Sequence, residues 1–209
     1  MLKKIINKFF QNKINLTNLD QLIDYIDRNS SFVSQVTLYP YIKTRAGTQH
    51  PKLFENEKFL TSLRISRWHI YISCVNDISI FVASICARDH DYSNKKGYKL
   101  AEYLSLRTFK KIQQNDINDN EFEFSAKKIS VIYKDLNLKK VKERDVLFKK
   151  SADELIKWAP VSEQFKKEDE TILRNSINFR WIIVRKEINQ NIDTNEINNQ
   201  WESIYKNYS

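Results

Sequence analysis

The sequence predicts an all-α fold, a single helical domain built around one apolar central helix. Three observations support this fold class. Hydrophobic residues make up 41% of the 209 residues, which is enough for a buried core and excludes a chain that is disordered throughout. Only 2 glycines and 3 prolines are present. β-Sandwiches and β-barrels need many such residues in their turns, and nucleotide-binding loops need several glycines. Apolar side chains also recur at the spacing of helix faces along most of the chain.

A basic amphipathic helix is expected at residues 2–14. Its apolar face carries Leu2, Ile5, Ile6, Phe9 and Phe10. Four lysines and no acidic residue give residues 1–19 a net charge of +4. We therefore expect three parts: the basic helix at 1–15, the helical domain at 16–190, and a short C-terminal helix or tail at 191–209. The basic helix could attach to an anionic membrane or to a protein partner, or it could pack on its own domain.

Two helices are expected between the basic helix and the centre of the chain. The first has an apolar face made of Leu19, Leu22, Ile23 and Ile26. Thr17 or Asn18 can cap its N-terminus. Residues 27–31 predict a polar break, after which the second helix runs over 32–45. Pro40 within the second helix predicts a kink, or an end and a restart, because proline lacks the backbone N–H.

The apolar centre of the chain predicts a buried helix. Residues 52–88 are expected to form one or two long helices, and 70–87 is the most apolar stretch of the sequence. Its length approaches that of a membrane span. However, Asn76 and Asp77 lie at its middle, and an aspartate at the centre of a spanning helix costs roughly 2.5–3.5 kcal/mol. We therefore interpret the stretch as the core helix of the domain, with a membrane span as the alternative.

A polar seam runs along this central helix. At 100° per residue, five polar side chains fall within about 40° of one line: Ser66, Ser73, Asp77, Ser84 and Arg88. A carboxylate inside such a helix should be paired or close to water. We expect Asp77 to form a buried polar network with Asn178 and Arg180 of a later helix. The alternative is an acidic group that lines a cleft.

The second half of the chain predicts further helices, at residues 97–113, 121–136, 151–158 and 162–189, with a last short helix around Trp201. Residues 95–150 carry fifteen lysines and arginines against eight acidic residues, a net charge of +7. Such an excess could attract nucleic acid, or it could simply be a lysine-rich solvated surface.

No catalytic motif is found. With glycine only at positions 47 and 97, the chain has no nucleophile elbow, P-loop or dinucleotide fingerprint. The histidines are far apart, so no catalytic residue, metal site or cofactor is predicted. Cys74 and Cys86 would lie about 18 Å apart along one helix, too far for a disulfide. Free thiols suit a reducing compartment, so we expect a cytoplasmic protein.

Two groups of residues are candidates for binding an anion. One surrounds Gly47, at the end of a predicted helix, where basic side chains, a hydroxyl and backbone N–H groups could hold a phosphate or carboxylate. The other is a stripe of arginines on the helix at 162–189, which could also stack on bases. The candidate residues are Lys43, Arg45, Thr48, Arg174 and Arg185. The alternatives are a favourable helix-dipole interaction for the first group and structural ion pairs for the second.

Three segments of the chain are distinctive: residues 37–48 (TLYPYIKTRAGT), 156–161 (IKWAPV) and 169–181 (DETILRNSINFRW). Together they resemble a family of uncharacterised alphaproteobacterial proteins of about this length. The resemblance extends over about 30–190 and implies a bacterial intracellular protein. Some members of that family carry an esterase label, which this sequence does not support with a nucleophile elbow.

These observations favour a non-catalytic binding or assembly factor with an anion-binding surface. Its expected partner is a protein or an anionic membrane surface, and its expected location is the cytoplasm, with peripheral attachment to the inner membrane as a variant of that hypothesis. A nucleic-acid-binding protein that uses the lysines of residues 95–150 is one alternative. An esterase-type hydrolase is another.

Overall fold

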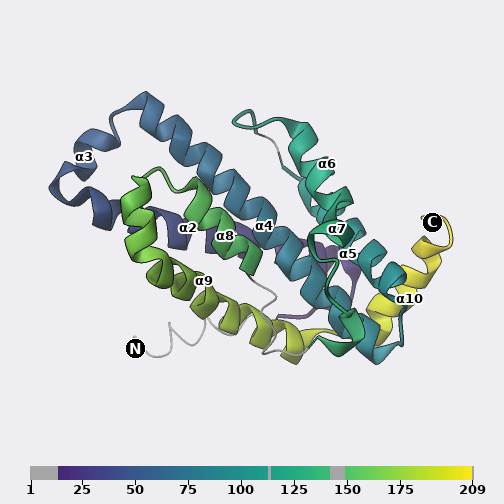
Figure 1. Cartoon of the computed structure of the whole chain (residues 1–209). Helices are drawn as coiled ribbons and strands as arrows, with labels where there is room; N and C mark the ends of the chain where they lie inside the picture. The colour runs from purple at the N-terminus through teal and green to yellow at the C-terminus, as the bar shows by residue number, and fades with distance from the viewer. Residues whose placement is uncertain (1–13, 113, 142–148, 209) are drawn as a thin grey trace, which may run out of the picture.

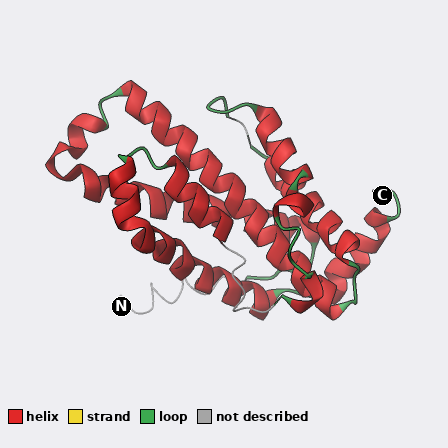
Figure 2. Cartoon of the chain, viewed as in Figure 1, coloured by secondary structure: helices red, strands yellow, loops and turns green. Residues whose placement is uncertain are grey.

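The computed structural model describes residues 14–112, 114–141 and 149–208, and these ranges contain helices but no strands (Figures 1 and 2). The helices are α2 (Leu19–Ala46), α3 (His50–Leu53), α4 (Glu57–Asp89), α5 (Asn94–Phe109), α6 (Asp119–Lys127), α7 (Ile129–Ile132), α8 (Lys149–Trp158), α9 (Glu163–Asn191) and α10 (Thr194–Tyr205), with short 3-10 turns at Gly47–Gln49 and Leu138–Lys140. The predicted all-α fold is confirmed. The predicted basic helix at residues 2–14 lies almost wholly outside the described residues.

Helix α4 is the core of the domain, as the sequence predicts. It runs through the middle of the molecule and contacts α2, α5 and α8 (Figure 1). Among the described helices, α4 is the one long and apolar enough to cross a membrane, but 94% of its most apolar window is buried inside the domain. A helix that is apolar on all sides is stable in water only when other helices cover it. The predicted buried central helix is therefore confirmed.

Helix α2 is continuous, so the predicted polar break at 27–31 is wrong. Ser30 and Val33 are fully buried on the inner face of this stretch, and packing on α4 keeps the backbone helical where local propensity alone is weak. Pro40 also lies inside the helix without ending it. The helix begins at the expected cap, where the Asn18 side chain accepts a hydrogen bond from the N–H of Gln21 at 2.8 Å. Gly47 ends it with a φ of 51°, which glycine adopts at little cost.

The single helix predicted at 121–136 is instead divided into α6 and α7, and the chain turns at Tyr133. The Tyr98 hydroxyl donates hydrogen bonds to the carbonyl oxygens of Tyr133 (2.6 Å) and Leu136 (2.9 Å). These carbonyls are held by a side chain of α5 and not by a further helical turn. The ending of the helix is thus decided by a contact between elements.

The start of the described chain lies beside the C-terminus of α9. The N–H of Leu16 donates to the carbonyl of Asn191 at 3.2 Å, and the N–H of Asp193 donates to the carbonyl of Leu16 at 3.0 Å. Helix α10 then packs against α4 and α2, with Ile197 and Trp201 fully buried. The chain therefore enters α2 from the same corner of the molecule at which α9 ends.

Candidate functional site

Asp77, in the middle of α4, is fully buried and accepts three hydrogen bonds. One carboxylate oxygen accepts from the Tyr133 hydroxyl at 2.5 Å. The other accepts from the backbone N–H of Ser151 at 3.0 Å and from the Ser151 hydroxyl. Because Ser151 lies near the start of α8, the carboxylate acts as a capping group supplied by another helix. Asp77 thus joins α4 to α8 and to the turn after α7.

Burial raises the pKa of Asp77 to about 7, although the hydrogen bonds from Ser151 and Tyr133 and the charge of Lys150 act in the opposite direction. Burial also raises the pKa of the neighbouring Cys74 thiol, which therefore stays protonated at neutral pH. In the described residues Cys74 and Cys86 are both free and buried.

The predicted network of Asp77 with Asn178 and Arg180 is not what the structure has. Asn178 is exposed, and the Arg180 guanidinium lies over the Phe32 ring at 6.0 Å from its centroid. The reason is the position of α8, which contacts both α4 and α9 and separates them (Figure 1). The seam of α4 therefore meets Ser151 of α8 and does not reach the polar side of α9.

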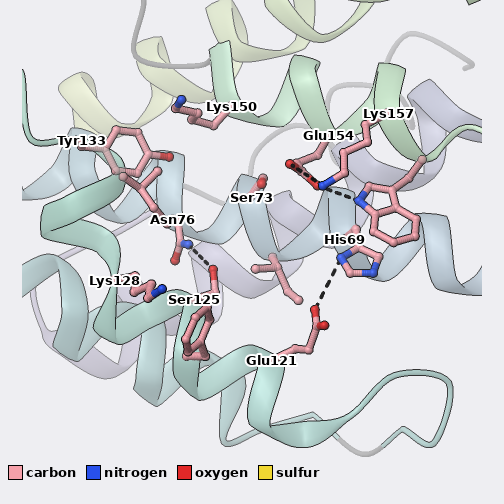
Figure 3. Close-up of a pocket in the computed structure, with 14 residues that line it drawn as sticks. His69, Ser73, Asn76, Glu121, Ser125, Lys128, Tyr133, Lys150, Glu154 and Lys157 are labelled. Atoms are coloured by element: carbon pink, nitrogen blue, oxygen red, sulfur yellow. Dashed lines mark hydrogen bonds and ion pairs between the residues drawn. The ribbon is translucent and has the colours of Figure 1, made fainter.

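A pocket of about 400 Å³ lies beside this network, between α4, α6–α7 and α8 (Figure 3). Its polar lining residues are His69, Ser73, Asn76, Glu121, Ser125, Lys128, Tyr133, Lys150, Glu154 and Lys157. Side chains of Phe124, Trp158 and two isoleucines complete the walls. The volume lies within the usual range for small-molecule sites in proteins, roughly 300–1,000 Å³.

One end of the pocket contains Asn76 and two lysines. Asn76 is 2% exposed, and its amide nitrogen donates to the Ser125 hydroxyl at 2.8 Å. Its amide oxygen has no hydrogen-bond partner among the described residues. Lys128 and Lys150 lie at the same end (Figure 3), and neither ammonium has a carboxylate of the described chain within 4.0 Å. This end is therefore positively charged and presents an unused acceptor.

The other end of the pocket is aromatic and carries the carboxylates. The His69 and Trp158 rings are stacked, with centroids 3.6 Å apart and planes 3° apart. The indole N–H of Trp158 donates to Glu154 at 2.7 Å, and His69 Nδ1 lies 3.7 Å from a Glu121 oxygen. Burial lowers the pKa of His69 in spite of these two carboxylates, so the imidazole is neutral at pH 7. Lys157 lies 3.9 Å from Glu154 and partly balances this end.

The five predicted anion-binding residues do not converge on one point. The Arg45 guanidinium forms two hydrogen bonds with Asp169 and lies over the Phe165 ring at 4.5 Å. That guanidinium also lowers the pKa of Asp169. Lys43 and Thr48 are exposed near the end of α2. An anion at this corner would have to compete with a carboxylate of the same chain.

The arginines of α9 are likewise engaged within the protein. Arg174 contacts Asp153 at 2.7 Å and Glu170 at 2.8 Å. Arg185 donates to the backbone carbonyl of Trp181 at 3.3 Å. An anion-binding role for these side chains stays a prediction. The residues that the structure does bring together, Lys128, Lys150 and Asn76, were not selected from the sequence, where Asn76 was noted only as a polar residue in an apolar helix.

The searches for similar proteins do not supply a function. No family model, curated protein or solved structure matches this chain. The resemblance to the alphaproteobacterial family thus stays a prediction, and the function has to be inferred from the chemistry of the pocket.

Proposed function

We propose that this protein is a non-catalytic binding protein whose pocket between α4, α6–α7 and α8 takes a small zwitterionic molecule. The anionic group of the ligand, a carboxylate or a phosphate, would lie at the end with Lys128 and Lys150. A nearby N–H or O–H of the ligand would donate to Asn76. The aromatic end would cover the rest of the ligand, and Glu121 would favour its cationic group.

The main support for this proposal is that the amide oxygen of Asn76 is buried and has no hydrogen-bond partner among the described residues. A buried acceptor without a partner costs about 1–3 kcal/mol, so most buried polar atoms in native proteins are paired. Here the unpaired atom lies in the wall of a pocket, beside two lysines whose ammonium groups have no carboxylate of the described residues within 4.0 Å. A ligand that offers a donor next to an anionic group would satisfy all three side chains together.

The alternatives receive less support from the geometry. In the described ranges no serine or cysteine side chain hydrogen-bonds to a histidine ring, so nothing favours an esterase-type mechanism. Lysines of residues 95–150 are paired with carboxylates across the surface of the domain: Lys96 with Glu202, Lys99 with Glu102, Lys111 with Asp24, Lys127 with Glu123, and Lys139 with Asp91. Such pairing within the described residues is typical of a solvated surface.

The proposal is tested by thermal unfolding of the full chain with amino acids, dipeptides, dicarboxylates and phosphate monoesters. A zwitterion at about 100 times its Kd should stabilise the fold by about 2.7 kcal/mol, which is a rise in Tm of roughly 5–10 °C. Lys150→Gln should remove most of that rise. Lys149→Gln is the matched control, because Lys149 is exposed and does not line the pocket. A rise that is equal in both variants, or no rise with any class, would contradict the proposal.

A further inference from the structure

Helix α9 is apolar on two opposite sides, and only one of them is buried. The inner side packs in the core through Leu173, Ile177, Trp181, Val184 and Ile188. The outer side leaves large apolar side chains in solvent, with exposed fractions of 66% for Ile172, 64% for Phe179, 54% for Ile182 and 48% for Ile183. Contiguous exposed apolar surface on a protein typically marks an interaction site.

The exposed side of α9 continues across α2. Phe32 of α2 is 51% exposed, and Arg180 of α9 lies over its ring. Further along the same pair of helices, a groove of about 460 Å³ is lined by Pro40 and Val36 of α2 and by Ile172 of α9. We call this surface, made of Phe32, Ile172, Phe179, Ile182 and Ile183, the α2–α9 face.

Between Ile172 and Lys186 of α9 the charged side chains are all basic, whereas the groove is also lined by Asp169, which is paired with Arg45. Arg180 lies over the ring of Phe32, and Lys186 is exposed one turn after Ile182 and Ile183. Leu16 is hydrogen-bonded to Asn191, at the C-terminal end of α9. Residues 1–13 precede that point in the sequence and add four lysines without an acid. Apolar and basic side chains together are the combination found at the surface of anionic bilayers.

We propose that the α2–α9 face is a docking surface for an anionic lipid bilayer. Phenylalanine and isoleucine side chains would enter the boundary between headgroups and acyl chains, while Arg180 and Lys186 contact lipid phosphates. Charge complementarity favours this occupant over two others. If a second copy of the protein docked through the same face, Arg180 and Lys186 would lie against like charges. If the basic segment 1–13 were the occupant, its lysines would be repelled by the same two side chains.

The test is sedimentation of the full chain with phosphatidylcholine vesicles that contain or lack phosphatidylglycerol. We expect at least about tenfold tighter binding to the anionic vesicles, and weaker binding as salt rises. The double variant Phe179→Ser/Ile183→Ser should weaken binding by about tenfold or more. Val131→Ser is the matched control, since Val131 is 63% exposed on α7 and lies outside the face. Thermal unfolding of each variant establishes that it is folded.

Four outcomes would overturn the inference. The first is no binding to either vesicle, and the second is equal binding to both. The third is a concentration-dependent dimer that Phe179→Ser/Ile183→Ser abolishes, which would make a second copy the occupant. The fourth is vesicle binding that deletion of residues 1–13 removes and the double variant leaves unchanged, which would place attachment in that segment alone. Loss of binding in the double variant, with the deletion weakening it only in part, supports the α2–α9 face.

Discussion

Asp77 and Asn76 are consecutive residues of α4. Asp77 belongs to the buried network and Asn76 lines the pocket beside it, and the two side chains differ in whether their polar atoms have hydrogen-bond partners. Asp77 is fully buried and accepts three hydrogen bonds from Tyr133 and Ser151. Asn76 is almost as buried, but its amide oxygen has no partner among the described residues. The two side chains are therefore nearly equally buried, but they differ in hydrogen bonding.

This difference separates a structural role from a binding role. A buried polar network with every member paired makes the packing of several elements specific. A buried polar atom that the fold leaves unpaired lowers stability, and in the wall of a pocket such an atom is available to a ligand. Asp77 is thus expected to matter for folding and Asn76 for binding, and the following variants test that division.

The largest effect is expected for Asp77→Ala. The change leaves the Tyr133 hydroxyl and the Ser151 N–H and hydroxyl buried without their acceptor, and it removes the capping carboxylate of α8. We expect a loss of about 3–5 kcal/mol in the free energy of unfolding, measured with urea. Asp135→Ala, at an exposed position, is the control and should change it by less than about 0.5 kcal/mol. A loss below about 1 kcal/mol for Asp77→Ala would show that the network is not structural.

The pH dependence of stability should identify Asp77 through its raised pKa. Between the ordinary pKa of an aspartate and about 7, the native state holds a proton on Asp77 that the unfolded state releases. The contribution of this group to stability is therefore greatest at acidic pH and falls as the pH rises towards 7. Asparagine in its place cannot ionise and does not lose stability in this way. As the pH rises from 4 to 7.5, the free energy of unfolding of Asp77→Asn should therefore increase relative to that of the wild type by on the order of 3 kcal/mol. Parallel curves of stability against pH for the two proteins would refute this assignment.

A much smaller effect is expected for Asn76→Leu. The variant loses the hydrogen bond to Ser125, whose hydroxyl can turn to water, and it also removes the unpaired acceptor from the core. The free energy of unfolding should change by less than about 1 kcal/mol in either direction. Thermal stabilisation by the zwitterionic ligand should be lost in the same variant. If Asn76→Leu lost as much stability as Asp77→Ala, Asn76 would have a structural role and not a binding role.

The smallest effect on stability is expected on α9, where the same contrast appears between neighbours. Trp181 is fully buried and Ile182 is 54% exposed. Ile182→Ser should change the free energy of unfolding by less than about 0.5 kcal/mol, whereas Trp181→Ala should cost about 3–5 kcal/mol. Chemical denaturation of both variants checks this. Strong destabilisation by Ile182→Ser would mean that the α2–α9 face is covered in the native protein.

Several features of the fold were predictable because they depend on short stretches of sequence. The apolar run at 70–87 predicts a buried helix, and the structure confirms α4 as the core. Asn18 and Gly47 mark the ends of α2 as expected. The continuity of α2 through 27–31 was not predictable in the same way, because Ser30 becomes compatible with the interior only once α2 packs on α4.

The partners of Asp77 illustrate what local reasoning could not reach. The sequence indicates that this carboxylate needs donors, and the structure supplies them from Tyr133 and Ser151, which are 56 and 74 residues away. Helical periodicity places Asp77 on a seam but does not say which helix lies against that seam. The prediction of Asn178 and Arg180 failed because α8 lies between α4 and α9.

The sequence by itself determined the all-α class and the burial of α4, since apolar content, helical spacing and the scarcity of glycine are properties of local stretches. Only the tertiary structure decided which polar groups meet. The rotation of each helix about its axis, and the order in which helices pack, bring Lys128, Lys150 and Asn76 to one end of a pocket. The same packing turns Trp181 into the core and leaves Phe179 in solvent, because a helix can bury only the side that its neighbours cover.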